Sequence, residues 1–232
     1  MSTPALDYDH LALVMSPERL APYLSEAKGS KPLAAELYAW NVEISGALWD
    51  LIVYLEVATR NAMARELQTL CVGMGSGRGP VPQWYNHRAW FTTRQNTAIQ
   101  DAKTRVRGKG LTSGRVIAQL TFGFWVSLVD PAHAPTLWIP GLHKAFPNSP
   151  GGHGPVRAKL GWVNDIRNDI AHHNRLFGRK ILDVEQELMR TAFWVDPKLA
   201  DWMSSVSAVR AANARRPDLP PTLRWPVPTP TP

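Results

Sequence analysis

Residues 31–72, KPLAAELYAWNVEISGALWDLIVYLEVATRNAMARELQTLCV, decide the fold of this chain. After Pro32 this stretch holds no further proline and a single glycine, Gly46. Large apolar side chains recur in it every three or four residues, which is the spacing of one face of an α-helix. These positions are Leu33, Leu37, Trp40, Ile44, Leu48, Leu51, Ile52 and Leu55. The stretch therefore predicts one long helix at the centre of the core.

The sequence on either side of this helix also favours helices. Ser16 followed by Pro17 is typical of a helix start and predicts a short helix to about residue 28. Residues 73–83 and 148–155 are rich in glycine and proline and are expected to be irregular connections. Further helices are expected over residues 88–107, 113–129, 155–175, 183–193 and 197–214, with a short turn at 142–146.

These elements predict an all-α helical bundle that forms a single domain over residues 1–215. The remaining residues, 216–232, alternate proline with small and polar residues. Proline removes a backbone donor at each of its positions, so neither a helix nor an inner strand is expected there. We expect a disordered, proline-rich tail.

The charge of the chain indicates the kind of partner it binds. Lysine and arginine number 26 against 19 aspartates and glutamates, which gives a net charge of +7. Such an excess favours a polyanionic partner, because basic side chains release counterions from phosphates. Nucleic acid leads the candidates, and an arginine-rich composition that reflects genomic base bias is the alternative.

The cysteine count and the chain's start bear on its compartment. Cys71 is the only cysteine, so an intramolecular disulfide is excluded, and no Cys/His spacing resembles a zinc site. The first residues lack a basic start followed by an apolar stretch, and no apolar run reaches the length of a membrane span. We expect a cytoplasmic protein without a metal, a cofactor or a membrane association.

Residues 164–175, NDIRNDIAHHNR, carry the strongest functional signal. On a helical projection the apolar residues Val163, Ile166, Ile170 and Phe177 fall on one side. The opposite side gathers Asn164, Asn168, His172 and Arg175. A solvated face usually favours lysine and glutamate, whereas amides, histidine and arginine are residues that bind phosphates and donate hydrogen bonds.

Arg167 and His172 suit phosphodiester cleavage. An arginine carries a planar fork matched to phosphate oxygens, and a histidine can take or give a proton near neutral pH. The two side chains lie about 140° apart on an ideal helix, so they do not lie on one narrow face of it. They can still contact one bound group from two sides. The alternative is a surface pair that is bonded to neighbouring loops.

The segment RNDIAH, from Arg167 to His172, resembles the Arg-x4-6-His signature of the HEPN superfamily, in which the residue after arginine is polar, as Asn168 is. Residues 38–41 (YAWN), 55–62 (LEVATRNA), 120–125 (LTFGFW) and 171–177 (AHHNRLF) resemble its Abi-like, abortive-infection branch. The resemblance spans residues 38–177.

This resemblance implies a HEPN-like helical bundle that forms a homodimer. Two signature segments would face each other in a composite endoribonuclease site that needs no metal, and the role would be antiphage defence. RNA is the implied substrate, with a small RNA or an antitoxin as a further partner. The rival hypothesis is a non-catalytic RNA-binding module that uses the same face, and a purely structural dimer is the third.

Several residues have expected supporting roles. Asn168, which belongs to the catalytic signature, is expected to orient its neighbours or to bond across a dimer rather than to do chemistry, and His173 to point toward the apolar side as a structural residue. Glu56 and Arg60 form an i,i+4 ion pair in one interpretation. In the other, one of them positions Arg167, with Asn61 nearby.

A second group of residues is expected to contact the RNA backbone. The densest basic cluster lies around a glycine-broken turn and comprises Arg105, Arg107, Lys109 and Arg115. A solvated loop is the alternative for this cluster. Trp84 and Trp90 are expected to be exposed stacking platforms, whereas Trp40, Trp49, Trp125 and Trp162 are expected in the core.

Overall fold

The computed structural model describes residues 7–74 and 82–219 and is all-α, with no strand in those residues. In chain order the helices are α1 (Tyr8–Met15), α2 (Pro17–Glu26), α3 (Lys31–Gly73), α4 (Thr93–Val106), α5 (Ser113–Gln119), α6 (Phe122–Ser127), α7 (His153–Ala171), α8 (Ile181–Val195), α9 (Pro197–Val206) and α10 (Val209–Asn213). Short helical turns lie between them: η1 (Trp84–Asn86), η2 (Arg88–Trp90), η3 (Arg107–Lys109), η4 (Pro131–His133), η5 (Ala134–Trp138) and η6 (Leu142–Ala145). No helix within these residues is long and apolar enough to cross a membrane.

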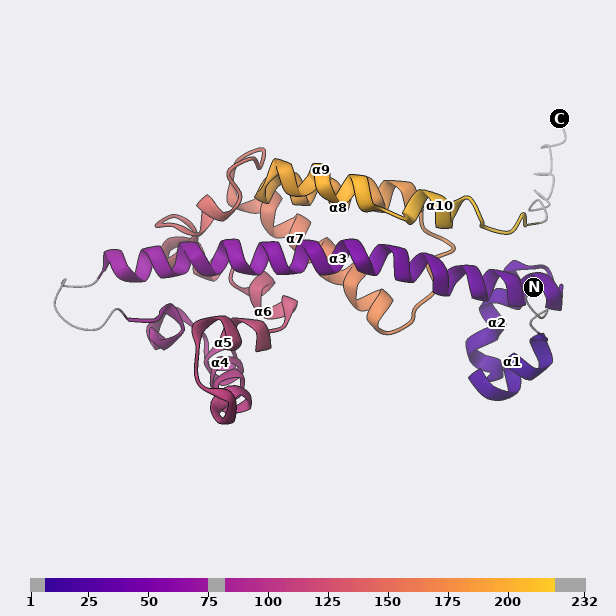
Figure 1. Ribbon diagram of the computed structural model, residues 1–232, viewed down its shortest axis with the longest axis horizontal. Helices are drawn as coiled ribbons and strands as arrows, with labels where there is room; N and C mark the ends of the chain where they lie inside the picture. The colour runs from indigo at the N-terminus through magenta and orange to yellow at the C-terminus, as the bar shows by residue number, and fades with distance from the viewer. Residues whose placement is uncertain (1–6, 75–81, 220–232) are drawn as a thin grey trace, which may run out of the picture.

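The predicted central helix is confirmed as α3, which is 43 residues long. Its apolar stripe is buried from Leu37 to Leu67. Figure 1 shows α3 running the length of the molecule, with α8, α9 and α10 along one side and α4 to α6 and α1 to α2 on the other. Because the remaining helices pack on α3 rather than forming separate cores, one cluster of buried side chains runs through the described residues.

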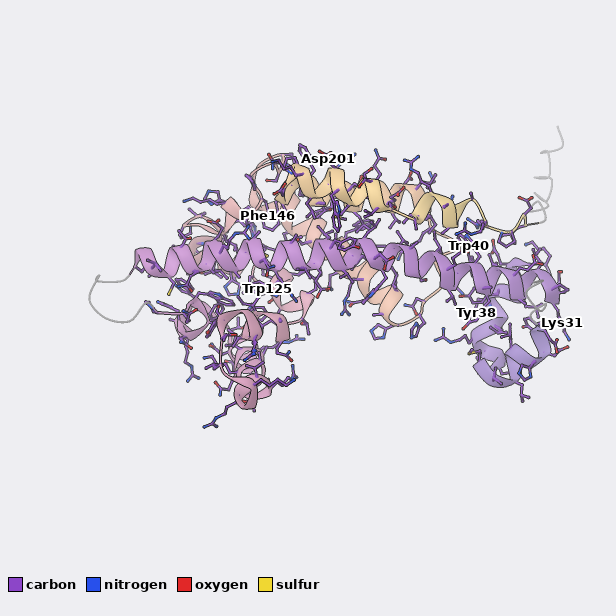
Figure 2. The ribbon with its side chains drawn as sticks, in the orientation of Figure 1. Lys31, Tyr38, Trp40, Trp125, Phe146 and Asp201 are labelled. Carbon is purple, nitrogen blue, oxygen red and sulfur yellow. The ribbon has the colours of Figure 1, made fainter. Side chains whose placement is uncertain are left out.

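The N-terminal part of α3 is anchored to neighbouring helices. Trp40 donates its indole N–H to the carbonyl of Ala212 in α10, and Tyr38 packs edge-on against Tyr23 of α2. Figure 2 accordingly shows Trp40 and Tyr38 on opposite sides of the helix. At its start, Lys31 forms an ion pair with Asp9 of α1 at 2.7 Å.

The predicted helix over residues 113–129 is wrong in one respect, because the chain breaks into α5 and α6. Leu120 leaves the helix with extended backbone, and the Thr121 hydroxyl then accepts a hydrogen bond from the Phe124 amide at 3.3 Å. Threonine is a favourable N-cap, so it begins a new helix where apolar periodicity alone would continue the old one.

The prediction of exposed Trp84 and Trp90 is also wrong. Trp84 is fully buried, with its ring against Phe91 and Trp125, and Trp90 is buried with its ring stacked on His87 at 4.3 Å. These tryptophans hold the η1 and η2 turns on the core and offer no stacking platform. The core placement of Trp40 and Trp125 is confirmed, and Trp49 and Trp162 are half-buried against the core.

The predicted tail begins too early in the sequence. Arg216 donates to the carbonyl of Phe177 at 2.8 Å, and its guanidinium lies 5.0 Å from the centre of the Trp40 ring. Leu219 packs partly against the core. The domain therefore extends to at least residue 219, while residues 220–232 and the stretch 75–81 of the glycine-rich connection lie outside the described residues.

Candidate functional site

The signature segment occupies the C-terminal end of α7 and the turn that follows it. Val163, Ile166 and Ile170 are buried as predicted, which fixes the apolar side of α7 against the core. The helix ends at Ala171, because His173 adopts a left-handed backbone with φ of 56°. The predicted continuation of this helix through Arg175 is therefore wrong.

This helix end is held by Asp169. The backbone amide of Asn174 donates to the carbonyl of Asp169 at 2.7 Å, and the Asn174 side chain donates to the Asp169 carboxylate at 3.0 Å. The same carboxylate forms an ion pair with Arg179. Asp169 thus holds the turn against the end of α7, and its carboxylate is paired with Arg179.

Arg167 lies between two residues of α3. Its Nε is 3.7 Å from Oε2 of Glu56, and its guanidinium carbon is 5.5 Å from the centre of the Trp49 ring. The carboxylate attracts the guanidinium and the ring presents its face to it, so both contacts favour this orientation of Arg167, although its buried Nε has no hydrogen-bond partner in the described residues. Of the two interpretations of Glu56, the structure favours the one in which it positions Arg167, and Glu56 makes no ion pair with Arg60.

Asn168 and His172 follow Arg167 in the segment. The Asn168 amide oxygen lies 3.5 Å from Nη1 of Arg167, and the Asn168 backbone carbonyl accepts the amide of His172 at 2.9 Å. The side chain of His172 is exposed and makes no hydrogen bond within the described residues. The segment thus carries a guanidinium in contact with Glu56 and Trp49 and, five residues further on, an imidazole that is open to a ligand.

The remaining predicted site residues are not brought to this pair. Asn164 lies on α7 near Gly123 of α6, and Asn61 is exposed on α3. The Nε of Arg60 is buried without a hydrogen-bond partner in the described residues. Arg175 lies beyond the helix end, with its guanidinium 5.9 Å from the centre of the Phe177 ring, so it does not share the polar face of α7.

The prediction for His173 is wrong. It is exposed rather than turned toward the apolar side, because the left-handed backbone takes it off the helical projection. Its carbonyl accepts a hydrogen bond from Arg19 of α2 at 2.9 Å. His173 therefore connects the end of α7 to α2.

The basic cluster is exposed at the turn between α4 and α5. Arg115 donates to the backbone carbonyls of Lys109 and Gly110, which closes the turn, while Arg105 and Arg107 extend into solvent. In Figure 1, α4 and α5 lie on the same side of α3 as the C-terminal end of α7, but they are separated from it along the α3 axis. The cluster is a separate basic surface and not part of the Arg167 and His172 pair.

Sequence reasoning missed Asn41, which positions the signature segment. Asn41 is only 4% exposed. Its side-chain oxygen accepts the amide of Leu176 at 2.6 Å, and its side-chain nitrogen lies 3.5 Å from the carbonyl of Asn174. The available signal was a polar residue between Leu37 and Ile44 in the apolar stripe of α3, since a buried amide must find hydrogen-bond partners.

An aromatic group beside Asn41 completes the support for this segment. Tyr23 of α2 packs edge-on against Tyr38 and Phe177, each at 5.2 Å between ring centres. Burial, reinforced by Tyr38, raises the pKa of Tyr23 to about 12, so its phenol stays neutral. The residues after His172 are therefore packed on α2 and α3.

No protein-family model matches the chain, and neither a curated protein nor a solved structure matches it. Within the described residues, no group of three or more histidine, cysteine, aspartate or glutamate side chains is arranged to hold a metal ion.

Proposed function

We propose that this protein is an endoribonuclease of the HEPN type, with Arg167 and His172 as its catalytic residues. The observation that carries the proposal is that one segment carries both an Arg167 in contact with Glu56 and Trp49 and, on the next turn, an exposed His172. Positioning of this kind is what charge stabilisation requires, because a fixed guanidinium needs no reorganisation as charge develops on a phosphate.

The proposed chemistry uses the substrate's own nucleophile. A base removes the proton of the ribose 2′-OH, whose oxygen forms a new bond to the adjacent phosphorus. The bond from phosphorus to the 5′-oxygen breaks, and an acid donates a proton to that leaving oxygen. His172 transfers protons, and Arg167 stabilises the negative charge on the phosphate oxygens. The products are a 2′,3′-cyclic phosphate and a 5′-hydroxyl.

A homodimer supports this chemistry better than a single chain. The reaction needs a base and an acid at once, and one chain supplies a single His172, so a second copy would supply the other histidine. Two valines of α3 lie close to Glu56 in the sequence and are partly exposed, Val53 by 40% and Val57 by 36%. Exposed valines on both sides of Glu56 in the sequence support association of two copies near Arg167.

A non-catalytic RNA-binding module is the second candidate. The observation that favours it is the absence, within the described residues, of a hydrogen bond that orients the His172 ring. In that case the Arg167 face grips a phosphate without transferring protons. The biological role that we propose with the enzyme, abortive-infection defence, rests on the resemblance alone, as does a small RNA or an antitoxin as a partner.

The deciding experiment is incubation of RNA with the purified protein in EDTA. We expect cleavage to survive chelation and to leave cyclic phosphate ends. His172→Ala and Arg167→Ala should each remove most of the activity while both proteins stay folded, and His10→Ala, an exposed histidine on α1, is the matched control. A 2′-deoxynucleotide at the cut position should block cutting there. Cleavage that requires Mg²⁺, or that His172→Ala retains in full, would transfer support to the RNA-binding module.

A further inference from the structure

A groove of about 680 Å³ opens beside the proposed catalytic segment. It lies between α3, the end of α7 and the junction of α1 with α2. Tyr38, Gly46 and Trp49 line it from α3, and Ile170 and His173 line it from the signature segment. Its volume is in the range of small-ligand sites, and its walls combine aromatic rings with a few polar groups, as such sites do.

Gly46 gives this groove its space. It lies in the middle of the 43-residue α3, where glycine destabilises a helix relative to alanine. No positive φ requires glycine there, and a Cβ built on it would meet no heavy atom within 4 Å. Nothing inside the described chain therefore explains the glycine. A ligand that lies flat against the backbone of α3 does explain it, because any larger side chain would occupy the same space.

The charges around the groove indicate the kind of ligand. Among the described residues, Arg19 and His173 are the ionisable basic residues that line it, and no aspartate or glutamate does. The two are fixed together, because Arg19 donates to the carbonyl of His173 at 2.9 Å. A neighbouring cleft of about 570 Å³ shares both residues and is also lined by Arg175 and by one carboxylate, Glu18. A ligand with a flat apolar part and an anionic part fits an aromatic groove with a basic rim.

We propose that this groove binds a nucleobase of the RNA substrate, next to the phosphate that is cut, and that Arg19 holds the adjoining phosphate. The inference rests on the proposed function, because it takes RNA as the ligand. Trp49 and Tyr38 provide ring surfaces for a base, and His173 is the residue directly after His172.

The test fills the groove without touching the catalytic pair. Gly46→Leu places a side chain in the groove and raises the helix propensity of α3, so the variant should fold, which circular dichroism and a melting curve would verify. Gly161→Leu is the matched control, because Gly161 is also a mid-helix glycine with open space around it but does not line the groove. Calorimetry would then measure binding of the four nucleoside 5′-monophosphates and of ribose 5-phosphate, which lacks a base.

We expect at least one nucleotide to bind the wild type at least tenfold more tightly than ribose 5-phosphate. Gly46→Leu should abolish that preference, and Gly161→Leu should keep it. Equal binding of ribose 5-phosphate and all four nucleotides would overturn the proposal. So would a Gly46→Leu protein that binds nucleotides normally but no longer dimerises, since the groove would then be a contact between copies.

Cleavage assays separate this inference from the proposed function. We expect Gly46→Leu to raise KM for RNA at least tenfold with a smaller change in kcat. If RNA is cut in a His172-dependent way and Gly46→Leu leaves KM unchanged, the nucleobase site is refuted and the enzyme stands. If no RNA is cut but nucleotide binding is lost in Gly46→Leu, the enzyme is refuted and the base-binding groove stands.

Discussion

Replacement of Asn41 by alanine is expected to destabilise the protein far more than an ordinary polar substitution on α3. The wild-type amide oxygen accepts the buried amide of Leu176 at 2.6 Å, and Leu176 itself is fully buried. Alanine removes this hydrogen bond and leaves a buried N–H without a partner. The lost bond is worth about 1 kcal/mol and the unsatisfied donor about 1–3 kcal/mol, so unfolding should become easier by roughly 2–4 kcal/mol.

Thermal and urea unfolding, followed by circular dichroism, would measure this effect. In a chain of this size each kcal/mol lowers Tm by about 2–4 °C, so Asn41→Ala should melt on the order of 10 °C below wild type. Asn61→Ala is the matched control, because Asn61 lies on the same helix and is exposed, and it should change stability by less than about 0.5 kcal/mol. The activity of Asn41→Ala should also fall, because residues 174–176 hold the turn after His172. A variant that melts within two or three degrees of wild type would refute the assignment of Asn41 as the anchor.

Three further outcomes are expected. Gly46→Ala should stabilise α3 by about 0.5–1 kcal/mol in urea unfolding, since a methyl group there meets no neighbour, and a loss of stability would show a contact that the structure lacks. Burial lowers the pKa of His133 below its ordinary value of 6.5, so the unfolded chain binds the proton more readily and stability should fall as pH drops through 6.5. His133→Gln should flatten that part of the pH profile, and an unchanged profile would assign the acid sensitivity to other groups. Arg105→Ala combined with Arg107→Ala should reduce the salt dependence of RNA binding, whereas an unchanged slope would place the phosphate contacts elsewhere.

The sequence alone determined the elements whose signals are local. Apolar spacing over residues 31–72 predicts α3, and Ser16 with Pro17 predicts the start of α2, because helix periodicity and capping depend on residues a few positions apart. The same periodicity identified the buried side of α7 through Val163, Ile166 and Ile170. It failed where a local cap interrupts an apolar pattern, as Thr121 does between α5 and α6.

Tertiary structure alone decided how the candidate site is built. Periodicity indicates which side of a helix is apolar but not which helix that side packs on. The contact between Glu56 and Arg167 therefore depends on the packing of α7 on α3. The hydrogen bond from Leu176 to Asn41 joins residues 135 positions apart, and no local pattern encodes such a pair. The left-handed turn at His173 is likewise stabilised by contacts from elsewhere in the chain, including the hydrogen bond from Arg19. Long-range hydrogen bonds and packing, which form only when distant segments meet, therefore set the position of the residues that the sequence had singled out.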